Sequence, residues 1–261
     1  MNPLLQFRRV GQGEPLVLVH GYLGGSAQWA QEMRDLSPHF DVIAVDLPGY
    51  GQSRNWVAPH TIQGFSEAVL ALLDALHVSR FRLLGHSMGG MVVQEMARLQ
   101  PQRISQLILY GTGPLGCIPG RFETMEQSRA RLRADGLQAT ARRISARWFT
   151  DGEDAAGYPL CAQLACEASE DAALAGLNAM EGWDGRPALA TLAMPTQIIW
   201  GEYDRSYRFD QVQALWQGIP HSSLAVIPRA CHAAHLEQPA LFRDILRIAL
   251  NHPGNGAGTS R

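Results

Sequence analysis

The stretch Gly85-His86-Ser87-Met88-Gly89 decides the fold, because it reads G-x-S-x-G between a strand pattern and a helix pattern. Residues 80–84 before it are typical of a short strand entering a core, and residues 90–99 after it have helical spacing that ends before a proline. A serine on such a sharp turn holds its hydroxyl out at the end of a sheet. The flanking glycines allow the tight turn and the close approach of a substrate.

A glycine-rich turn without a chemical role is the alternative interpretation of this motif. The chain contains 26 glycines, so a G-x-S-x-G match on its own is weak. The strand before the motif and the helix after it favour the functional interpretation, in which Ser87 is a nucleophile.

Short apolar runs alternate with amphipathic segments along most of the chain. They predict strands at residues 16–19, 42–45, 107–110, 196–200 and 224–227, and helices at residues 63–76 and 240–250. Continuously apolar strands separated by helices predict an α/β fold, with a mostly parallel sheet covered by helices on both faces.

One long interval, residues 115–193, breaks this alternation. It contains no convincing buried strand, and windows such as 122–133 and 137–148 fit helices. We expect a helical lid over 115–193, placed where open α/β sheets bind ligands. The core is then formed by residues 1–114 and 194–252, and residues 253–261 form a disordered tail.

Length and charge restrict the classes of function. A chain of 261 residues with 46% hydrophobic residues suits one globular unit, and a net charge of −2 gives no sign of nucleic-acid binding. All 22 basic residues are arginines, which excludes a catalytic lysine and a P-loop. No apolar run approaches the roughly 18 residues of a membrane span, so we expect no membrane partner.

The cysteines and the first residues predict a cytoplasmic protein. The four cysteines show neither a C-x-x-C pair nor zinc spacing, so we expect free thiols in a reducing compartment and no metal site. Residues 1–9 contain no apolar signal-peptide core. The sequence does not indicate an oligomeric state.

Three polar side chains follow predicted strands in the order Ser87, Asp204 and His232. The carboxyl ends of parallel strands meet at one edge of a sheet, so these side chains are expected to converge. A serine hydroxyl needs a neighbouring base to act as a nucleophile at neutral pH, and the base needs a carboxylate to orient it. The order Ser, Asp, His is the one found in nucleophile-elbow hydrolases.

The chain resembles the α/β-hydrolase superfamily over essentially its whole length outside the lid. The resemblance rests on five motifs, which are His20-Gly21-Tyr22-Leu23-Gly24-Gly25, Asp46-Leu47-Pro48-Gly49-Tyr50-Gly51-Gln52-Ser53, Gly85 to Gly90, Gly201-Glu202-Tyr203-Asp204, and His232-Ala233-Ala234-His235-Leu236-Glu237-Gln238-Pro239. It implies an α/β-hydrolase fold with the lid inserted after the sixth strand. Among its branches, the chain is most similar to small bacterial hydrolases of enol-lactones, esters and ring-cleavage products, and Arg147-Trp148-Phe149-Thr150 is reminiscent of enol-lactone hydrolases.

Two histidines compete for the role of base. His232 precedes Glu237 by five positions, as the family pattern implies, although Cys231 stands where the family usually has glycine. His235 is the alternative, but we expect it to be a surface or cap residue at the start of the next helix. For the acid, Glu202 and Asp210 are rivals of Asp204, which occupies the motif position.

An oxyanion hole requires two N–H donors aimed at the developing charge. The amide of Met88 follows the nucleophile at a helix N-terminus, and the resemblance implies the amide of Tyr22 as the second donor, with Leu23 next to it. We expect Leu23 and Trp148 to contact the substrate. His20 is expected to hydrogen-bond within its loop, and Asp46 and Ser53 to shape their turn.

Seven of the arginines in the predicted lid are candidates for substrate binding, and one or two of them could bind a substrate carboxylate. The alternative is that they lie on solvated helix faces. Trp148, Phe149 and Trp183 either line the pocket or pack the lid. The arginines are Arg121, Arg129, Arg131, Arg133, Arg142, Arg143 and Arg147.

The sequence therefore predicts a cofactor-free serine hydrolase with a Ser87–His232–Asp204 triad. Its substrate is a small carboxylic ester or enol-lactone, cleaved through an acyl-enzyme. One alternative is a carbon–carbon bond hydrolase that acts on a 2-hydroxy-6-oxo-dienoate from meta ring cleavage. The other is a hydrolase-like binding protein without turnover, because a fold does not fix a reaction.

Overall fold

The centre of the molecule is a seven-stranded sheet, seen in a computed structural model that describes residues 4–251. The strand order is β1-β3-β2-β4-β5-β6-β7. The strands are Phe7–Val10 (β1), Glu14–Val19 (β2), Phe40–Val45 (β3), Phe81–His86 (β4), Ile104–Tyr110 (β5), Thr196–Gly201 (β6) and Ser222–Ile227 (β7). Only β1 is antiparallel to its neighbour in this part of the chain, which confirms a mostly parallel sheet.

Helices surround the sheet, and three of them lie in the long connection between β5 and β6. The α-helices are Ala30–Leu36 (α1), Ile62–Ala75 (α2), Met88–Leu99 (α3), Met125–Ala146 (α4), Tyr158–Glu167 (α5), Glu170–Glu181 (α6), Phe209–Gly218 (α7), Ala234–Glu237 (α8) and Pro239–Asn251 (α9). Short 3₁₀ helices span Ser26–Trp29, Gly51–Ser53, Pro101–Arg103, Gly152–Asp154 and Arg186–Thr191.

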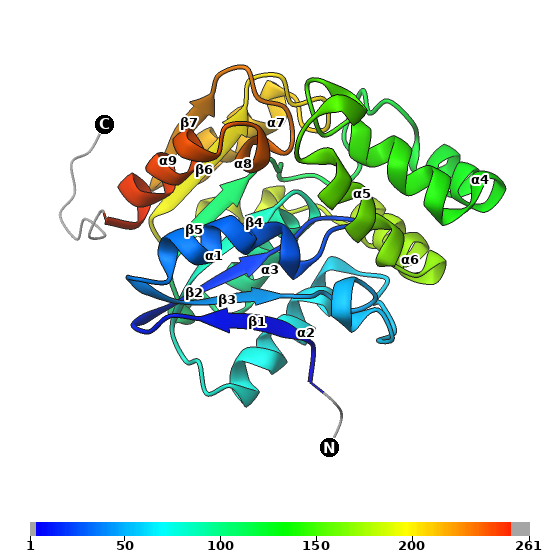
Figure 1. The fold of residues 1–261 in the computed structure, drawn as a ribbon. Helices are drawn as coiled ribbons and strands as arrows, with labels where there is room; N and C mark the ends of the chain where they lie inside the picture. Colours follow the sequence, from blue (N-terminus) through cyan, green and yellow to red (C-terminus); the bar gives the residue numbers. More distant parts are fainter. Residues whose placement is uncertain (1–3, 252–261) are drawn as a thin grey trace.

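Alternate residues of the central strands belong to two different cores. In β2, Val17 and Val19 pack with α2, α3 and α7, whereas Leu16 and Leu18 pack with α1 and α9. Because side chains alternate across a strand, an unbroken apolar run supplies both faces at once. The prediction of helices on both faces is confirmed (Figure 1).

The long interval forms a helical segment between β5 and β6, called the insertion below. Its helices α4, α5 and α6 gather at one end of the sheet (Figure 1). The structure corrects the expected position, because five strands and not six precede the insertion in the described residues. The two helices predicted at 122–133 and 137–148 form one kinked helix, α4, with Gly136 at the kink (φ 76°). The predicted tail, 253–261, lies outside the described residues.

Candidate active site

Ser87 occupies a strained turn between β4 and α3. Its backbone has φ 56° and ψ −121°, a left-handed conformation that costs a residue with a side chain energy of order 1–3 kcal/mol. The Ser87 amide donates to the Tyr110 carbonyl at 3.0 Å, and the Thr112 hydroxyl donates to the Ser87 carbonyl at 2.8 Å. The neighbouring strand and its loop therefore hold this turn in place.

Glycines on both sides of Ser87 permit close backbone packing. A Cβ atom on Gly89 would lie 2.3 Å from the carbonyl oxygen of His20, and one on Gly21 would lie 2.8 Å from the Cβ of Ser87. No side chain fits at either position without moving the backbone. The loop after β2 is thereby brought against the turn that carries Ser87.

Asp204 and His232 form a buried pair at the ends of two neighbouring strands. Asp204 follows β6 and His232 follows β7, and His232 Nδ1 lies 2.9 Å from Asp204 Oδ2. The other carboxylate oxygen, Oδ1, accepts the amides of Ser206 and Tyr207 at 2.7 and 3.1 Å. These bonds hold the carboxylate toward the imidazole, which leaves Nε2 of His232 as the nitrogen able to act on a substrate.

The two rival carboxylates are not part of this pair. Glu202 accepts the amide of Arg229 at 2.9 Å, and Asp210 is exposed in the first turn of α7. The geometry therefore selects Asp204 as the partner of His232.

Glu237 explains the five-residue spacing after His232. Its Oε2 accepts the amide of Cys231 at 2.5 Å, and its Oε1 accepts the amide of Thr150 in the insertion at 2.6 Å. The Ala233 amide also donates to the Trp148 carbonyl at 2.9 Å. We call these contacts the Glu237 anchor. They join the His232 loop to the insertion.

The expectation that His235 lies at the surface is wrong. His235 lies in α8, is buried beside Trp29 and Phe242, and pairs its Nδ1 with the Tyr110 hydroxyl at 3.1 Å. Burial lowers its pKa to about 3. The short helix α8 directs the His235 side chain toward the sheet and away from the cavity. Trp29 and Phe242 therefore lie against it.

Three other polar residues form structural hydrogen bonds, although Asp46 and Ser53, which were expected to shape their own turn, bond residues outside it. His20 approaches the Gly21 carbonyl with Nδ1 at 2.8 Å and accepts the Leu47 amide on Nε2 at 3.0 Å. Asp46 accepts the amide and hydroxyl of Ser26, and Ser53 accepts the amide of Gln6.

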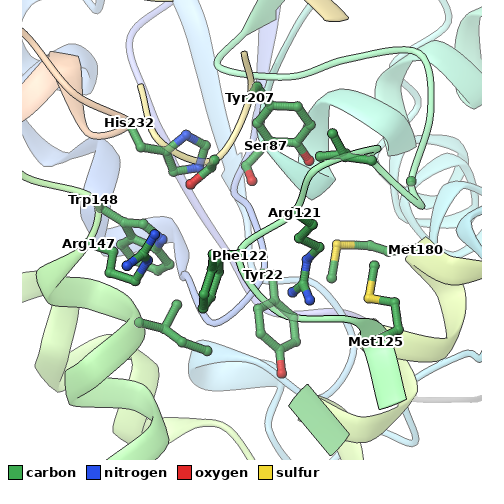
Figure 2. A pocket seen from close by; sticks show the side chains of 14 residues that line it. Tyr22, Ser87, Arg121, Phe122, Met125, Arg147, Trp148, Met180, Tyr207 and His232 are labelled. Atoms are coloured by element: carbon green, nitrogen blue, oxygen red, sulfur yellow. The ribbon is translucent and has the colours of Figure 1, made fainter. Parts of the chain in front are cut away.

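Ser87 and His232 line one cavity, with the insertion forming its opposite wall (Figure 2). No hydrogen bond joins Ser87 Oγ to His232 Nε2 within residues 4–251. Hydrogen bonds of this kind often tighten only when substrate binds. The Ser87 hydroxyl and the His232 imidazole thus line one cavity, and the Asp204 carboxylate lies behind the imidazole.

Met88 follows Ser87 at the start of α3, and Tyr22 lies in the loop after β2 and lines the same cavity as Ser87. Among the described residues neither amide donates to another protein group, so both remain free to bind an oxyanion. Leu23, expected to contact substrate, does not line the cavity. It is fully buried in the core, because its left-handed backbone (φ 57°) turns its side chain inward.

Tyr207 is the cavity residue that sequence reasoning missed. Its ring stacks on His232 with centroids 5.8 Å apart, and its hydroxyl lies beside Ser87 in Figure 2. Burial raises its pKa, and hydrogen bonding to Ser87 opposes that effect. Its position three residues after Asp204, in the same loop, is the sequence feature that could have identified Tyr207 as a cavity residue.

The aromatic residues of the insertion divide between cavity and core. Trp148 lines the cavity, as expected, with its ring 6.1 Å from that of His232. Phe149 and Trp183 are buried in packing and do not line it.

Most of the arginines in the insertion are not in the cavity. Arg129 pairs with Glu181, and both Arg131 and Arg143 pair with Glu123. Arg121 and Arg147 do line the cavity.

No other site type is evident in the described part of the chain. Residues 4–251 contain no group of three or more His, Cys, Asp and Glu side chains placed to hold a metal ion. None of their helices combines the length and apolar character needed to cross a membrane.

This fold and site define an α/β hydrolase, and the chain belongs to that family: the alpha/beta hydrolase fold model matches residues 14–239. It is 31% identical to a pimeloyl-[acyl-carrier protein] methyl ester esterase of Pseudoalteromonas atlantica, over 93% of this chain and 96% of the relative. It is 27% identical to a 2-hydroxy-6-oxo-6-phenylhexa-2,4-dienoate hydrolase of Comamonas testosteroni, over 93% and 89%. The enol-lactonase structure from Burkholderia xenovorans LB400 superposes with a TM-score of 0.87 at 25% identity, covering 95% and 96%.

Proposed function

We propose that this protein is a serine hydrolase that cleaves a small carboxylic ester or lactone through an acyl-enzyme. The observation that carries the proposal is the buried Asp204–His232 pair at 2.9 Å, which shares a cavity with the strained Ser87. The similarity to an ester hydrolase and to an enol-lactonase supports the same reaction class.

The reaction begins when Nε2 of His232 takes the hydroxyl proton of Ser87. The Ser87 oxygen attacks the substrate carbonyl carbon, and the amides of Tyr22 and Met88 bind the resulting oxyanion. The tetrahedral species collapses, the carbon–oxygen bond breaks, and the leaving oxygen takes the proton from His232. Asp204 keeps the imidazole in the required tautomer and stabilises its positive charge.

Water completes the cycle. His232 removes a proton from a water molecule that attacks the acyl-enzyme carbonyl, and the proton then passes to the Ser87 oxygen as the acid product leaves. The insertion acts as a lid that shapes the space above the acyl group. No cofactor takes part in these steps.

Carbon–carbon bond hydrolysis of a dienoate is the second candidate, favoured by the similarity to the dienoate hydrolase. The two candidates are separated by comparing turnover of short p-nitrophenyl esters with the loss of colour of a 2-hydroxy-6-oxo-dienoate. If kcat/KM is higher for the dienoate than for the esters, carbon–carbon bond hydrolysis is the function and ester hydrolysis is not.

The proposal is tested by labelling the purified protein with a fluorophosphonate probe and by assaying ester hydrolysis. We expect the probe to modify Ser87, and the Ser87→Ala variant to lose both labelling and hydrolysis while it melts at the wild-type temperature. Full activity in the variant, or no labelling of the wild-type protein, contradicts the mechanism. The second result favours a binding protein without turnover.

A further inference from the structure

Arg121 brings a positive charge into the cavity without a carboxylate to neutralise it. The side chain is half-buried and lines the cavity together with Ser87. One of its nitrogens, Nη1, donates to the Glu123 carbonyl at 2.7 Å and to the Ser128 hydroxyl at 2.9 Å. Within residues 4–251 its other N–H groups have no protein partner, and no Asp or Glu forms an ion pair with it.

The nearest carboxylate belongs to other arginines. Glu123 follows Arg121 by two positions, but its Oε1 accepts Nη1 of Arg131 at 2.6 Å and Nη1 of Arg143 at 2.8 Å. Its Oε2 accepts the hydroxyl of Ser128 at 3.1 Å. The carboxylate is therefore saturated by two guanidinium groups, and Arg121 reaches only neutral oxygens.

A comparison with Arg129 shows how a carboxylate partner changes the pKa of an arginine. Hydrogen bonding to Glu181 raises the pKa of Arg129, whereas burial lowers the pKa of Arg121 from its usual value. A guanidinium stays charged in proteins, so Arg121 is held in a place where its charge is incompletely compensated. Such an arrangement is costly to the protein unless a ligand supplies the missing anion.

The rest of the cavity provides no such anion. None of its lining residues is an aspartate or glutamate. Figure 2 shows the guanidinium of Arg121 among Tyr22, Met125 and Met180, away from His232. Arg147, the other cavity arginine, lies over the ring of Phe122 at 4.0 Å, and Arg121 lies farther from the centre of the same ring, at 5.4 Å.

We propose that Arg121 binds a carboxylate of the substrate, so that the substrate is an ester or lactone with a free carboxylate beyond the carbonyl that Ser87 attacks. This inference rests on the proposed function. A guanidinium presents paired N–H groups that match the two oxygens of a carboxylate. The carboxylate would fix the distance between the anionic end of the substrate and its reacting carbonyl.

The test compares two series of methyl esters, namely the monomethyl and dimethyl esters of straight-chain dicarboxylic acids from succinate to pimelate. At neutral pH the monoesters carry one carboxylate and the diesters carry none. We expect the wild-type protein to have a higher kcat/KM for the monoester at the chain length that spans the cavity. In Arg121→Gln this preference should fall by about 10- to 100-fold, chiefly through KM, as expected for a lost charge-assisted hydrogen bond.

Two further variants make the result specific. Arg121→Lys keeps the charge and should retain part of the preference, and added salt should raise KM for the monoester alone. Arg129→Gln is the matched control, because Arg129 pairs with Glu181 outside the cavity. It should keep the wild-type preference.

The failures of the two proposals can be told apart. If the protein hydrolyses both series and is labelled at Ser87, but prefers diesters or keeps its preference in Arg121→Gln, the inference about Arg121 is wrong and the proposed function stands. If neither series is hydrolysed and the fluorophosphonate does not label Ser87, the proposed function fails and the inference fails with it.

Discussion

The sheet and the insertion contribute to the same cavity in different ways. The sheet presents Ser87, Asp204 and His232 from loops that follow β4, β6 and β7, and backbone hydrogen bonds fix each loop. The insertion presents Arg121 and Trp148 from the segments on either side of α4. Under the proposed function, we expect the sheet to determine the reaction and the insertion to determine which substrates bind. The following variants test this division.

The largest expected effect is on the sheet side, at Asp204. Asp204→Asn should lower kcat by roughly 10⁴-fold, because an amide favours the wrong tautomer of the histidine. The melting temperature should change little, since the side chain keeps its size. The comparison variant is Glu202→Gln, whose side chain bonds only the Arg229 amide. It should keep its kcat, and an equal loss in both variants contradicts the role of Asp204.

Acid should weaken the sheet region through its buried histidines. The pKa of His235 is about 3 in the folded protein, so between about pH 6.5 and 3 the unfolded chain binds a proton that the folded protein does not. The free energy of unfolding should therefore fall as the pH falls through this range, by roughly 3–5 kcal/mol from His235 alone.

Chemical denaturation at several pH values measures this slope. Burial also lowers the pKa of His20 and His86, whereas residues 115–193 contain no histidine. His235→Gln should have a shallower slope than the wild-type protein. Equal slopes in the two proteins would mean that His235 does not cause the acid sensitivity.

Glycine substitutions in the two regions should separate stability from activity. In Gly89→Ala, the new Cβ lies 2.3 Å from the His20 carbonyl oxygen. In Gly136→Ala, the new Cβ meets no atom within 4 Å, but the backbone keeps a φ of 76° that strains a residue with a side chain. Each should cost roughly 1–3 kcal/mol of stability. Only Gly89→Ala should also lower kcat, because it moves the Ser87 turn. Thermal melts and ester assays on both variants provide the comparison.

The smallest effect is expected at Trp148 in the insertion. Trp148→Ala should raise KM by roughly threefold to tenfold with little change in kcat, as expected for the loss of about 1 kcal/mol of apolar contact with substrate. Trp183→Ala is its control, because Trp183 is buried away from the cavity. It should lower the melting temperature without raising KM.

The division between the two regions also explains which predictions succeeded. The strand and helix around Ser87 were predicted, because residues 80–84 have a strand pattern and residues 90–99 have helical spacing. Asp204 and His232 could be located because each follows a short apolar run that predicts a strand, although β7 is a partly exposed edge strand. β1 was missed because its sequence, FRRV, is mostly exposed and lacks that pattern.

Side-chain direction was harder to predict than element position. Leu23 turns into the core because of a left-handed backbone, and His235 turns inward on a helix of four residues; neither backbone is encoded by a periodic pattern. In the insertion, seven arginines were equal candidates for substrate binding on sequence alone. The tertiary pairing of Arg129, Arg131 and Arg143 with carboxylates separates these three from Arg121 and Arg147, which line the cavity.

The Glu237 anchor has a consequence for how this enzyme could be redesigned. It fastens the insertion to the His232 loop at Trp148 and Thr150, near the middle of the inserted segment and not at its ends. The anchor lies between α4 and the helices α5 and α6, and α4 packs against both of these helices. A redesign of the insertion should therefore leave the Glu237 anchor intact, so that the His232 loop keeps its position.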